Sequence, residues 1–178
     1  MKFIFVLHAN VSWDVDNKLK GQTNIELKED GFRQARELAK KLSKLGITLM
    51  ASSDLKRARQ TAEVINNTLN VPLYLEKGLR ECSFGKLEGT AKEQAIKKHK
   101  ELLKYWDESF QDYDFTSFDG EDQGQVLSRH LMILQKYKNL YPEETILIVG
   151  HSRGLSTLLH NLGYSAQIER GGYLEIEY

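Results

Sequence analysis

Two histidines each follow directly on a short apolar segment. His8 comes after Lys2–Leu7, with the sequence KFIFVL, and His151 comes after Thr145–Gly150, with the sequence TILIVG. Short runs of apolar, β-branched and aromatic residues are typical of buried strands. Ligands of an open parallel sheet bind at the carboxyl ends of its strands, so both imidazoles are predicted to face one crevice. There they are suited to metal ligation, acid–base catalysis or nucleophilic attack, and a purely structural pair is the competing interpretation.

Further residues would complete a site for phosphoryl transfer. Arg57 stands at the predicted start of a helix, where a guanidinium and exposed backbone N–H groups together favour a phosphate. The backbone N–H groups of Ser152 and Arg153 are expected to complete this cradle from the turn after the second histidine. Glu81, in a loop punctuated by glycines, offers a carboxyl able to protonate a leaving alkoxide. Taken alone, Arg57 is more typical of a surface ion pair and Glu81 of an exposed loop acid, so the prediction depends on the whole set.

Other catalytic motifs fit the sequence less well. Gly150–Gly154 matches the G-x-S-x-G pattern of a serine-hydrolase elbow, in which Ser152 would be the nucleophile. No Asp follows Ser152, and His160, eight residues further along the same predicted helix, is too distant to activate it. Cys82 has no arginine at the spacing of a cysteine-phosphatase loop, and the P-loop pattern lacks its first glycine. No H-x-x-x-H or cysteine cluster accompanies the two histidines, although a metal site of two histidines and one carboxylate stays open.

The elements that must position these residues alternate along the chain. Ser52–Asp54 offers N-caps for one helix, and Thr90–Glu93 resembles a capping box that opens another. Strands that alternate with helices indicate an α/β fold with a mostly parallel, helix-covered sheet. Helices are predicted from Lys28 to Leu45, from Leu55 to Leu69, over Val126–Leu140 and through Leu155–Leu162, and further strands over Ile47–Ala51, Val71–Leu75 and, at the edge, Gly171–Tyr178.

Two polar segments interrupt this alternation. Ala9–Asn24 is a long loop with turn-forming residues, and long loops in compact domains tend to be functional. Tyr105–Asp122 is rich in aromatic and acidic residues and has weak helical periodicity. It is interpreted either as a lid or irregular excursion, or as a solvated acidic surface segment.

Composition narrows the class of protein. The 178 residues, 40% hydrophobic and 28% charged, predict a single globular domain over 1–178 with a sizeable core. Lys+Arg and Asp+Glu both number 25, which argues against nonspecific binding of nucleic acid or membrane. A single cysteine, Cys82, rules out an intrachain disulfide and fits a reducing compartment. The opening apolar run is too short for a signal peptide and no run is long enough to span a membrane, so a cytoplasmic protein is expected.

Blocks of sequence resemble the histidine phosphatase superfamily, on its phosphoglycerate mutase-like branch, nearly from end to end. Residues 53–62, SDLKRARQTA, resemble the family's Ser-x-Leu-x-Arg-Ala-x-Gln-Thr-Ala block. Residues 79–89, LRECSFGKLEG, match its Leu-x-Glu-x-x-Phe-Gly-x-x-Glu-Gly block in full. Residues 149–151 match its late Val-x-His block. The two middle blocks are highly specific.

The resemblance implies a fold and a set of roles. The fold would be a three-layer α/β/α sandwich with a mostly parallel central sheet. His8 would be the residue phosphorylated, Glu81 the proton donor, and Arg57 and His151 phosphate ligands, with no metal or organic cofactor. Further candidates for binding phosphate or substrate are Ser152, Asn10, Asp14 and Thr23.

The first block departs from the family. Its arginine is replaced by Leu7, the glycine after the histidine by Ala9, and the Trp-Asn asparagine by Asp14. Losing one preorganised charge donor costs about two to three orders of magnitude in rate, by analogy with oxyanion holes. Arg153 is interpreted either as a substitute for the missing arginine or, with slight preference, as a surface residue.

Two classes of function therefore stay open. The first is a phosphate monoester hydrolase of weakened activity that acts through a phosphohistidine, on a small phosphorylated metabolite or a phosphoprotein. The second is a pseudoenzyme that keeps the pocket as a phospholigand- or protein-binding module. A mutase is a weaker third, since a mutase must retain a second phosphate. The oligomeric state is left open.

Overall fold

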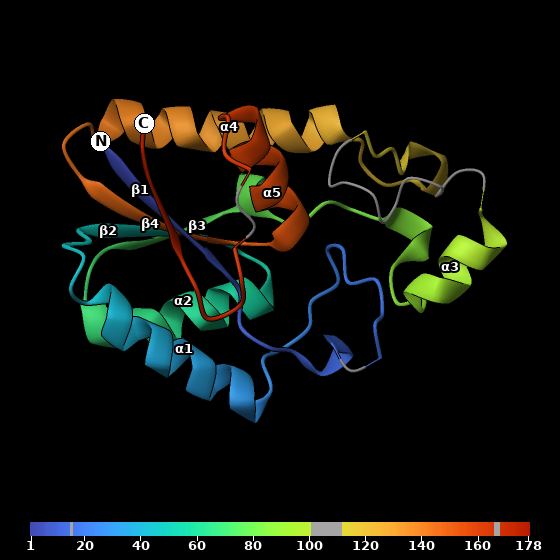
Figure 1. Cartoon of the computed structure of the whole chain (residues 1–178), viewed down its shortest axis with the longest axis horizontal. Coiled ribbons are helices and arrows are strands. Elements are labelled where there is room, and N and C mark those ends of the chain that lie inside the picture. Colours follow the sequence, from blue (N-terminus) through green and yellow to red (C-terminus); the bar gives the residue numbers. More distant parts are fainter. Residues whose placement is uncertain (15, 101–111, 166–167) are drawn as a thin grey trace.

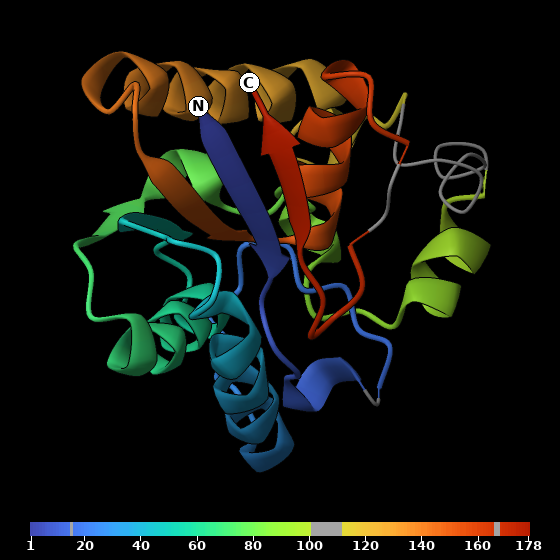
Figure 2. The ribbon, with the colours of Figure 1, turned by 60° about the vertical axis from the view of Figure 1, so that its left-hand side comes forward.

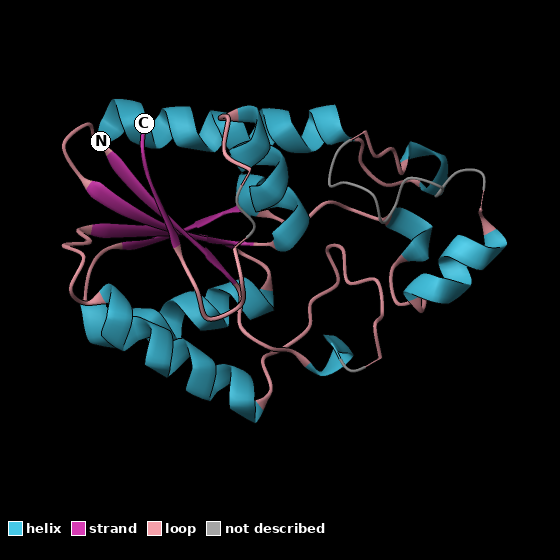
Figure 3. Cartoon of the chain, in the orientation of Figure 1, coloured by secondary structure: helices cyan, strands magenta, loops and turns pink. Residues whose placement is uncertain are grey.

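The computed structural model describes residues 1–178 apart from 15, 101–111 and 166–167, and the described residues form a central sheet of five strands. The strands are β1 (Lys2–Leu7), β2 (Leu49–Ser53), β3 (Leu73–Glu76), β4 (Thr145–Gly150) and β5 (Leu174–Glu177). Their order is β3-β2-β4-β1-β5, drawn in magenta in Figure 3. β1 to β4 are parallel to one another, and β5 pairs antiparallel with β1, as the predicted edge strand.

Helices cover both faces of this sheet. α1 (Glu29–Leu42) and α2 (Lys56–Leu69) lie on one face, and α4 (Gln123–Leu140) and α5 (Ser152–Asn161) lie on the other (Figure 1). This is an α/β/α sandwich with a mostly parallel sheet, so the predicted fold is confirmed. None of the described helices combines the length and the apolar character that crossing a membrane requires.

The central strands are apolar throughout because both of their faces are buried. In β1, Phe3, Phe5 and Leu7 pack into a cluster with residues of α4 and α5. Ile4 and Val6 point the other way and pack with residues of α1 and α2. Both faces of β1 are thus buried in the core, which fixes the strand in the sheet and places His8 directly after its carboxyl end.

Shorter elements complete the described chain, and all but the one directly after β3, which packs against α4, lie toward the end of the molecule opposite the two termini (Figure 1). They are η1 (Ser12–Asp14), η2 (Lys77–Leu79), η3 (Gly85–Leu87), α3 (Lys92–Lys98) and η4 (Thr116–Phe118). The prediction for Tyr105–Asp122 falls partly on residues 101–111, outside the described residues. In its described part, Tyr113, Phe115 and Phe118 are buried in a third apolar cluster, so a wholly solvated surface segment is ruled out there.

Two predicted helix caps are wrong. α3 begins at Lys92 after Ala91, and the Thr90 hydroxyl donates to the carbonyl of Leu87 instead of capping the helix. The N-cap of α2 is Leu55, without a side-chain hydrogen bond, and the candidate cap Asp54 pairs with a loop arginine. In both places a neighbouring acceptor or partner takes the polar side chain that local sequence assigns to the helix end.

Element boundaries also shift. α1 ends at Leu42, three residues before the expected Leu45, because a turn follows before Gly46 adopts a left-handed φ of 66°. The second strand starts at Leu49 instead of Ile47 and extends to Ser53. That extension matters, because it carries the Ser53 side chain to the same edge as His8.

Candidate active site

The two histidines meet at the carboxyl edge of the sheet. β1 and β4 are neighbours with Leu7 opposite Gly150, so His8 and His151 both leave the sheet at its next position. The ring centroids lie 5.3 Å apart. The backbone N–H of His8 donates a hydrogen bond to the carbonyl of Gly150 at 3.0 Å. The structure therefore brings the two imidazoles together, as the sequence predicts. His8 lines a cavity of about 150 Å³, whereas His151 is completely buried beside it.

The tautomer of His8 follows from the hydrogen bond of its ring to Ala9. Nδ1 lies 2.8 Å from the carbonyl oxygen of Ala9. A carbonyl oxygen only accepts, so Nδ1 carries the proton. Burial, followed by the positive charges of Arg57 and Arg170, holds the pKa of His8 well below its ordinary 6.5. His8 is therefore neutral at pH 7, with a lone pair on Nε2.

His151 is held by the neighbouring strand. Its Nε2 lies 2.8 Å from the hydroxyl of Ser53, at the end of β2. Burial and the nearby Arg57 guanidinium hold the pKa of His151 well below 6.5, so this ring is also neutral at pH 7. Its buried Nδ1 has no hydrogen-bond partner among the described residues. Because a hydroxyl can donate or accept, the ring is able to present an N–H at Nδ1 to a ligand.

Arg57 is a buried cation anchored by a loop. Its Nη1 donates to the carbonyl of Thr23 at 2.8 Å and its Nη2 to the carbonyl of Gly21 at 2.7 Å. Burial lowers the pKa of Arg57 to about 10, so the guanidinium stays charged at pH 7. Its buried Nε has no partner within the described part of the chain. The interpretation of Arg57 as a surface residue is wrong, since only 1% of the residue is exposed.

Glu81 lies at the start of α5 instead of in solvent. Its Oε1 accepts the backbone N–H groups of Gly154 at 2.9 Å and of Cys82 at 3.0 Å. Its Oε2 accepts the N–H of Arg153 at 3.3 Å and the hydroxyl of Ser152 at 3.4 Å. The expectation that backbone donors of this turn hold a phosphate is therefore wrong for Arg153, whose N–H is taken by Glu81. The exposed-acid interpretation is wrong too, since Glu81 is buried.

Arg129, on α4, holds the backbone of Glu81 in place. Its Nη2 donates to the Glu81 carbonyl at 2.9 Å, and the amide of Gln22 donates to the same oxygen at 3.1 Å. The Nε of Arg129 donates to Glu121 at 2.9 Å. No motif in the sequence singles out Arg129.

Three predicted substrate-binding residues lie behind the cavity wall. Asn10, Asp14 and Thr23 are not among the described residues that line it. The Thr23 hydroxyl donates to Glu88 at 2.8 Å, and its carbonyl is the one that anchors Arg57. The Asn10 amide donates to Asp30 at 3.2 Å. The backbone of Thr23 and the side-chain oxygen of Asn10 instead accept hydrogen bonds from Arg57 and Arg170, which do line the cavity.

Asp14 is a paired anion. It accepts the N–H of Val11 at 2.8 Å, pairs with Lys20 at 2.9 Å and accepts a hydrogen bond from Arg170. Burial alone raises the pKa of Asp14, but these three partners outweigh it and lower the pKa to about 2. The carboxylate is thus ionised and neutralised at pH 7, and it does not face a substrate as an unpaired negative charge.

Basic side chains dominate the cavity. Among the described residues that line it, six are lysine or arginine and one is acidic. The acidic residue is Glu81, and the basic ones are Lys18, Lys20, Arg57, Lys92, Arg153 and Arg170. A concave site with this balance attracts anions, although the whole chain has no net charge.

Leu7 lies in the core, and Arg153 lies at the cavity wall. Leu7 packs into the apolar cluster with Phe5 and Leu155 and does not line the cavity. Arg153 is 5% exposed, so its interpretation as a surface residue is wrong. Its guanidinium carbon lies 4.7 Å from the centre of the Tyr113 ring, a cation–π contact at the cavity wall.

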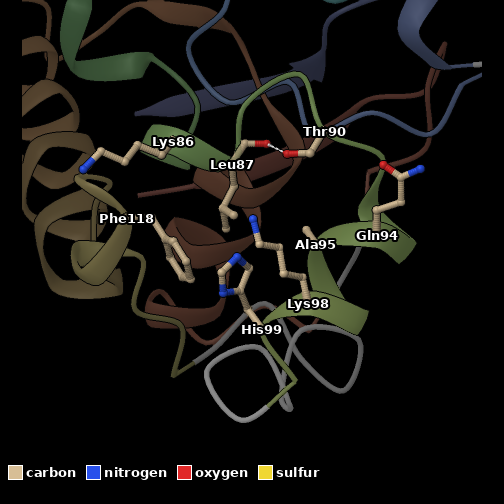
Figure 4. Close-up of a pocket in the computed structure, with 8 residues that line it drawn as sticks. All are labelled: Lys86, Leu87, Thr90, Gln94, Ala95, Lys98, His99 and Phe118. Atoms are coloured by element: carbon tan, nitrogen blue, oxygen red, sulfur yellow. Dashed lines mark hydrogen bonds between the residues drawn. The ribbon is translucent and has the colours of Figure 1, made fainter.

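A second, larger cavity of about 450 Å³ lies elsewhere, between α3 and η4 (Figure 4). Leu87, Lys98, His99 and Phe118 contribute to its lining, and the rings of His99 and Phe118 meet edge to face at 4.8 Å. No carboxyl group lines it among the described residues. Among the described residues, the smaller cavity combines a histidine with a carboxyl group and guanidinium groups, and the larger one does not.

The remaining alternatives find no support in the described residues. No three of their His, Cys, Asp and Glu side chains gather in a way that would hold a metal ion. Burial raises the pKa of the Cys82 thiol, and the residue is completely buried. Cys82 is therefore unsuited to act as a nucleophile.

Comparison with known proteins decides the family. The family model of the histidine phosphatase superfamily, branch 1, matches residues 3–177. The chain belongs to this superfamily. It is 29% identical to the uncharacterized phosphatase PhoE of Bacillus subtilis over 154 residues, covering 86% of this chain and 73% of the relative. It is also 29% identical to the probable phosphoglycerate mutase GpmB of Cronobacter sakazakii over 177 residues, covering 96% and 79%.

A solved structure has the same fold. YhfR of Bacillus stearothermophilus superposes with a TM-score of 0.90 at 24% identity, covering 99% of this chain and 90% of YhfR. The family match and the relatives place the chain among the phosphatase- and mutase-like enzymes of the superfamily.

A third buried histidine lies beneath the site. His130, on α4, has its Nδ1 2.8 Å from the carbonyl of Val126, and its Nε2 has no partner among the described residues. It packs against α5 so closely that a Cβ at Gly154 would lie 2.6 Å from Nε2. Burial, then the charge of Arg129, lowers the pKa of His130 to about 3.

This predicts a stability that falls with acid. Below pH 6.5 the unfolded chain protonates His130 while the folded chain does not, so the unfolding free energy decreases as pH drops from 6.5 toward 3. Between pH 7 and pH 5 this one residue should remove about 2 kcal/mol. Urea unfolding of His130→Leu should lack that part of the pH dependence, whereas exposed His160→Leu should keep it. An unchanged pH dependence in His130→Leu would contradict the account.

Proposed function

We propose that the chain hydrolyses phosphate monoesters through a phosphohistidine at His8. The observation that carries the proposal is the state of this ring: neutral, protonated at Nδ1, and lining a cation-rich cavity. Nε2 attacks phosphorus, the bond between phosphorus and the ester oxygen breaks, and Glu81 gives its proton to the departing oxygen. Water then attacks the phosphohistidine, Glu81 takes the proton of that water, and inorganic phosphate leaves.

Two buried donors support a phosphate at this position. Arg57 Nε and His151 Nδ1 lack partners in the described part of the chain, and a buried donor left without one costs about 1–3 kcal/mol. Phosphate oxygens would satisfy both. Because the other nitrogens of these side chains are already anchored to loop carbonyls and to Ser53, the donors are fixed before a ligand arrives.

The size of the cavity bears on the substrate. About 150 Å³ suits a phosphoryl group with the rest of the ester at the mouth, where Lys18, Lys20 and Lys92 attract anions. This fits a small phosphorylated metabolite or a phosphorylated side chain of a protein. We favour a phosphatase over a mutase, since a cavity of this size suits one phosphoryl group and a mutase must retain a second phosphate. Cys82, buried and unable to pair, supports a cytoplasmic location.

Activity is proposed to be weaker than that of a site with an arginine at position 7. Leu7 adds no charge to the cavity, and a donor missing from such a site lowers the rate by about 10² to 10³. Arg153, stacked on aromatic rings, and Arg170 are the cations at the cavity wall that could offset part of this loss.

Loss of the nucleophile is the first test. His8→Ala should reduce hydrolysis of p-nitrophenyl phosphate by about 10³-fold or more, while His160→Ala, an exposed histidine on α5, should not change it. Rapid acid quenching should lose the protein-bound phosphate that alkaline quenching keeps, since phosphohistidine is acid-labile. Equal rates for wild type and His8→Ala would remove the hydrolase and favour a pseudoenzyme that binds phospholigands.

The second test separates the acid from the nucleophile. Glu81→Gln should slow hydrolysis of alkyl phosphates by about 10² or more and that of aryl phosphates much less, because an aryl oxide leaves without a proton. Steady-state kinetics on one alkyl and one aryl substrate measure the difference. Exposed Glu93→Gln is the matched control. The same loss on both substrates would exclude Glu81 as the proton donor.

A further inference from the structure

The edge strand delivers an arginine to the cavity. β5 runs antiparallel to β1, so its first residue lies at the edge where the parallel strands end (Figure 2). The register pairs Phe5 with Leu174, and continuing it past the last pair would bring Arg170 beside Ala9, next to the nucleophile. The turn before β5, closed by the hydrogen bond from Gly172 N–H to the carbonyl of Glu169 at 2.9 Å, carries Arg170 to the cavity wall.

One nitrogen of Arg170 is anchored and the others are not. Nη1 donates to the carboxylate of Asp14 and, at 3.4 Å, to the side-chain oxygen of Asn10. Nε and Nη2 make no hydrogen bond to the described part of the chain. The side chain is 31% exposed and lines the cavity with His8 and Arg57. Asp14 thus holds one side of a planar guanidinium whose other donors stay available.

Arg170 is close enough to act on the reacting groups. After burial, its positive charge and that of Arg57 are what lower the pKa of His8, and the charge of Arg170 also lowers the pKa of Arg57. Arg57 itself has both terminal nitrogens bound to loop carbonyls. Of the two guanidinium groups that act on His8, Arg57 would therefore offer a phosphate dianion only its Nε, whereas Arg170 still has two donors to offer.

We propose that Arg170 is a phosphate-binding residue of this site, and that Asp14 is the positioning residue that orients it. Arg170 contributes the second guanidinium to the bound phosphoryl group, in place of the charge that Leu7 does not provide. The proposal rests on the proposed function only for the identity of the anion. Its rival is that Arg170 does no more than neutralise Asp14.

Binding of inorganic phosphate to the whole chain tests this without turnover. Isothermal titration calorimetry should give Arg170→Gln a phosphate affinity at least about tenfold below wild type, the loss expected for one charge-assisted contact. Arg36→Gln, an exposed arginine on α1, should bind phosphate within twofold of wild type. Melting temperature is recorded for each variant. A folded Arg170→Gln protein with wild-type affinity overturns the proposal.

A double variant separates binding from neutralisation. If Arg170 only cancels the charge of Asp14, Arg170→Gln with Asp14→Asn should recover wild-type phosphate affinity, and that recovery would overturn the proposal. If Arg170 itself binds phosphate, the double variant stays at least about tenfold weak. Asp14→Asn alone should weaken binding by a smaller factor, because Nη1 loses its charged anchor.

A conservative variant covers the case in which Arg170→Gln does not fold. Arg170→Lys keeps the positive charge but loses the planar fork, so it should bind phosphate more weakly than wild type by several-fold. If Arg170→Lys binds phosphate with wild-type affinity, the proposed contact of the planar guanidinium with phosphate is overturned. These measurements are independent of catalysis. Phosphate affinity that depends on Arg170 in a protein without hydrolase activity refutes the proposed function alone, and hydrolysis with Arg170-independent affinity refutes this inference alone.

Discussion

The site depends on the hydrogen bond from His8 Nδ1 to the carbonyl of Ala9. The bond joins neighbouring residues, so it sets the orientation of the ring from within the chain. It also places the single proton of a neutral imidazole on the nitrogen that does not react. Burial and the two nearby guanidinium groups keep the ring neutral, and the lone pair is therefore permanent at pH 7. The central sheet holds the backbone of His8 in place, because its backbone N–H donates a hydrogen bond to the carbonyl of Gly150.

Concentrating cations around a neutral ring requires support from the loops. Arg57 is fixed by two carbonyls of the segment that follows η1, and that segment is fixed in turn by Glu88, which accepts the N–H of Gln22 at 2.9 Å. Arg170 is fixed by Asp14. Both guanidinium groups are thus held before a ligand binds, and little reorganisation remains for the moment of reaction. A chain of zero net charge can build such a site because Asp14 and Glu88, the carboxylates that support these cations, do not line the cavity.

Some of this was readable from the sequence and some was not. His8 and His151 were predictable because two continuous apolar strands end in them and parallel strands share one edge. The sequence predicts that the backbone N–H of Arg153 is available to a phosphate. That prediction is wrong, because Glu81, 72 residues earlier, accepts this N–H in a tertiary contact that no local pattern reveals. Arg170 was missed, since only the antiparallel pairing of β5 brings it back to the first block. Thr90 failed as a cap because a nearby carbonyl competed for its hydroxyl.

The protonation state of His8 is the most direct test of the central claim. Long-range proton–nitrogen NMR of the protein labelled with ¹⁵N-histidine reports the state of each ring nitrogen, and His8→Gln identifies the signals of His8. The account predicts, at pH 7, a neutral ring with its proton on Nδ1 and a bare Nε2. A doubly protonated ring, or a proton on Nε2, would leave no lone pair on Nε2 for attack at phosphorus and would contradict the account.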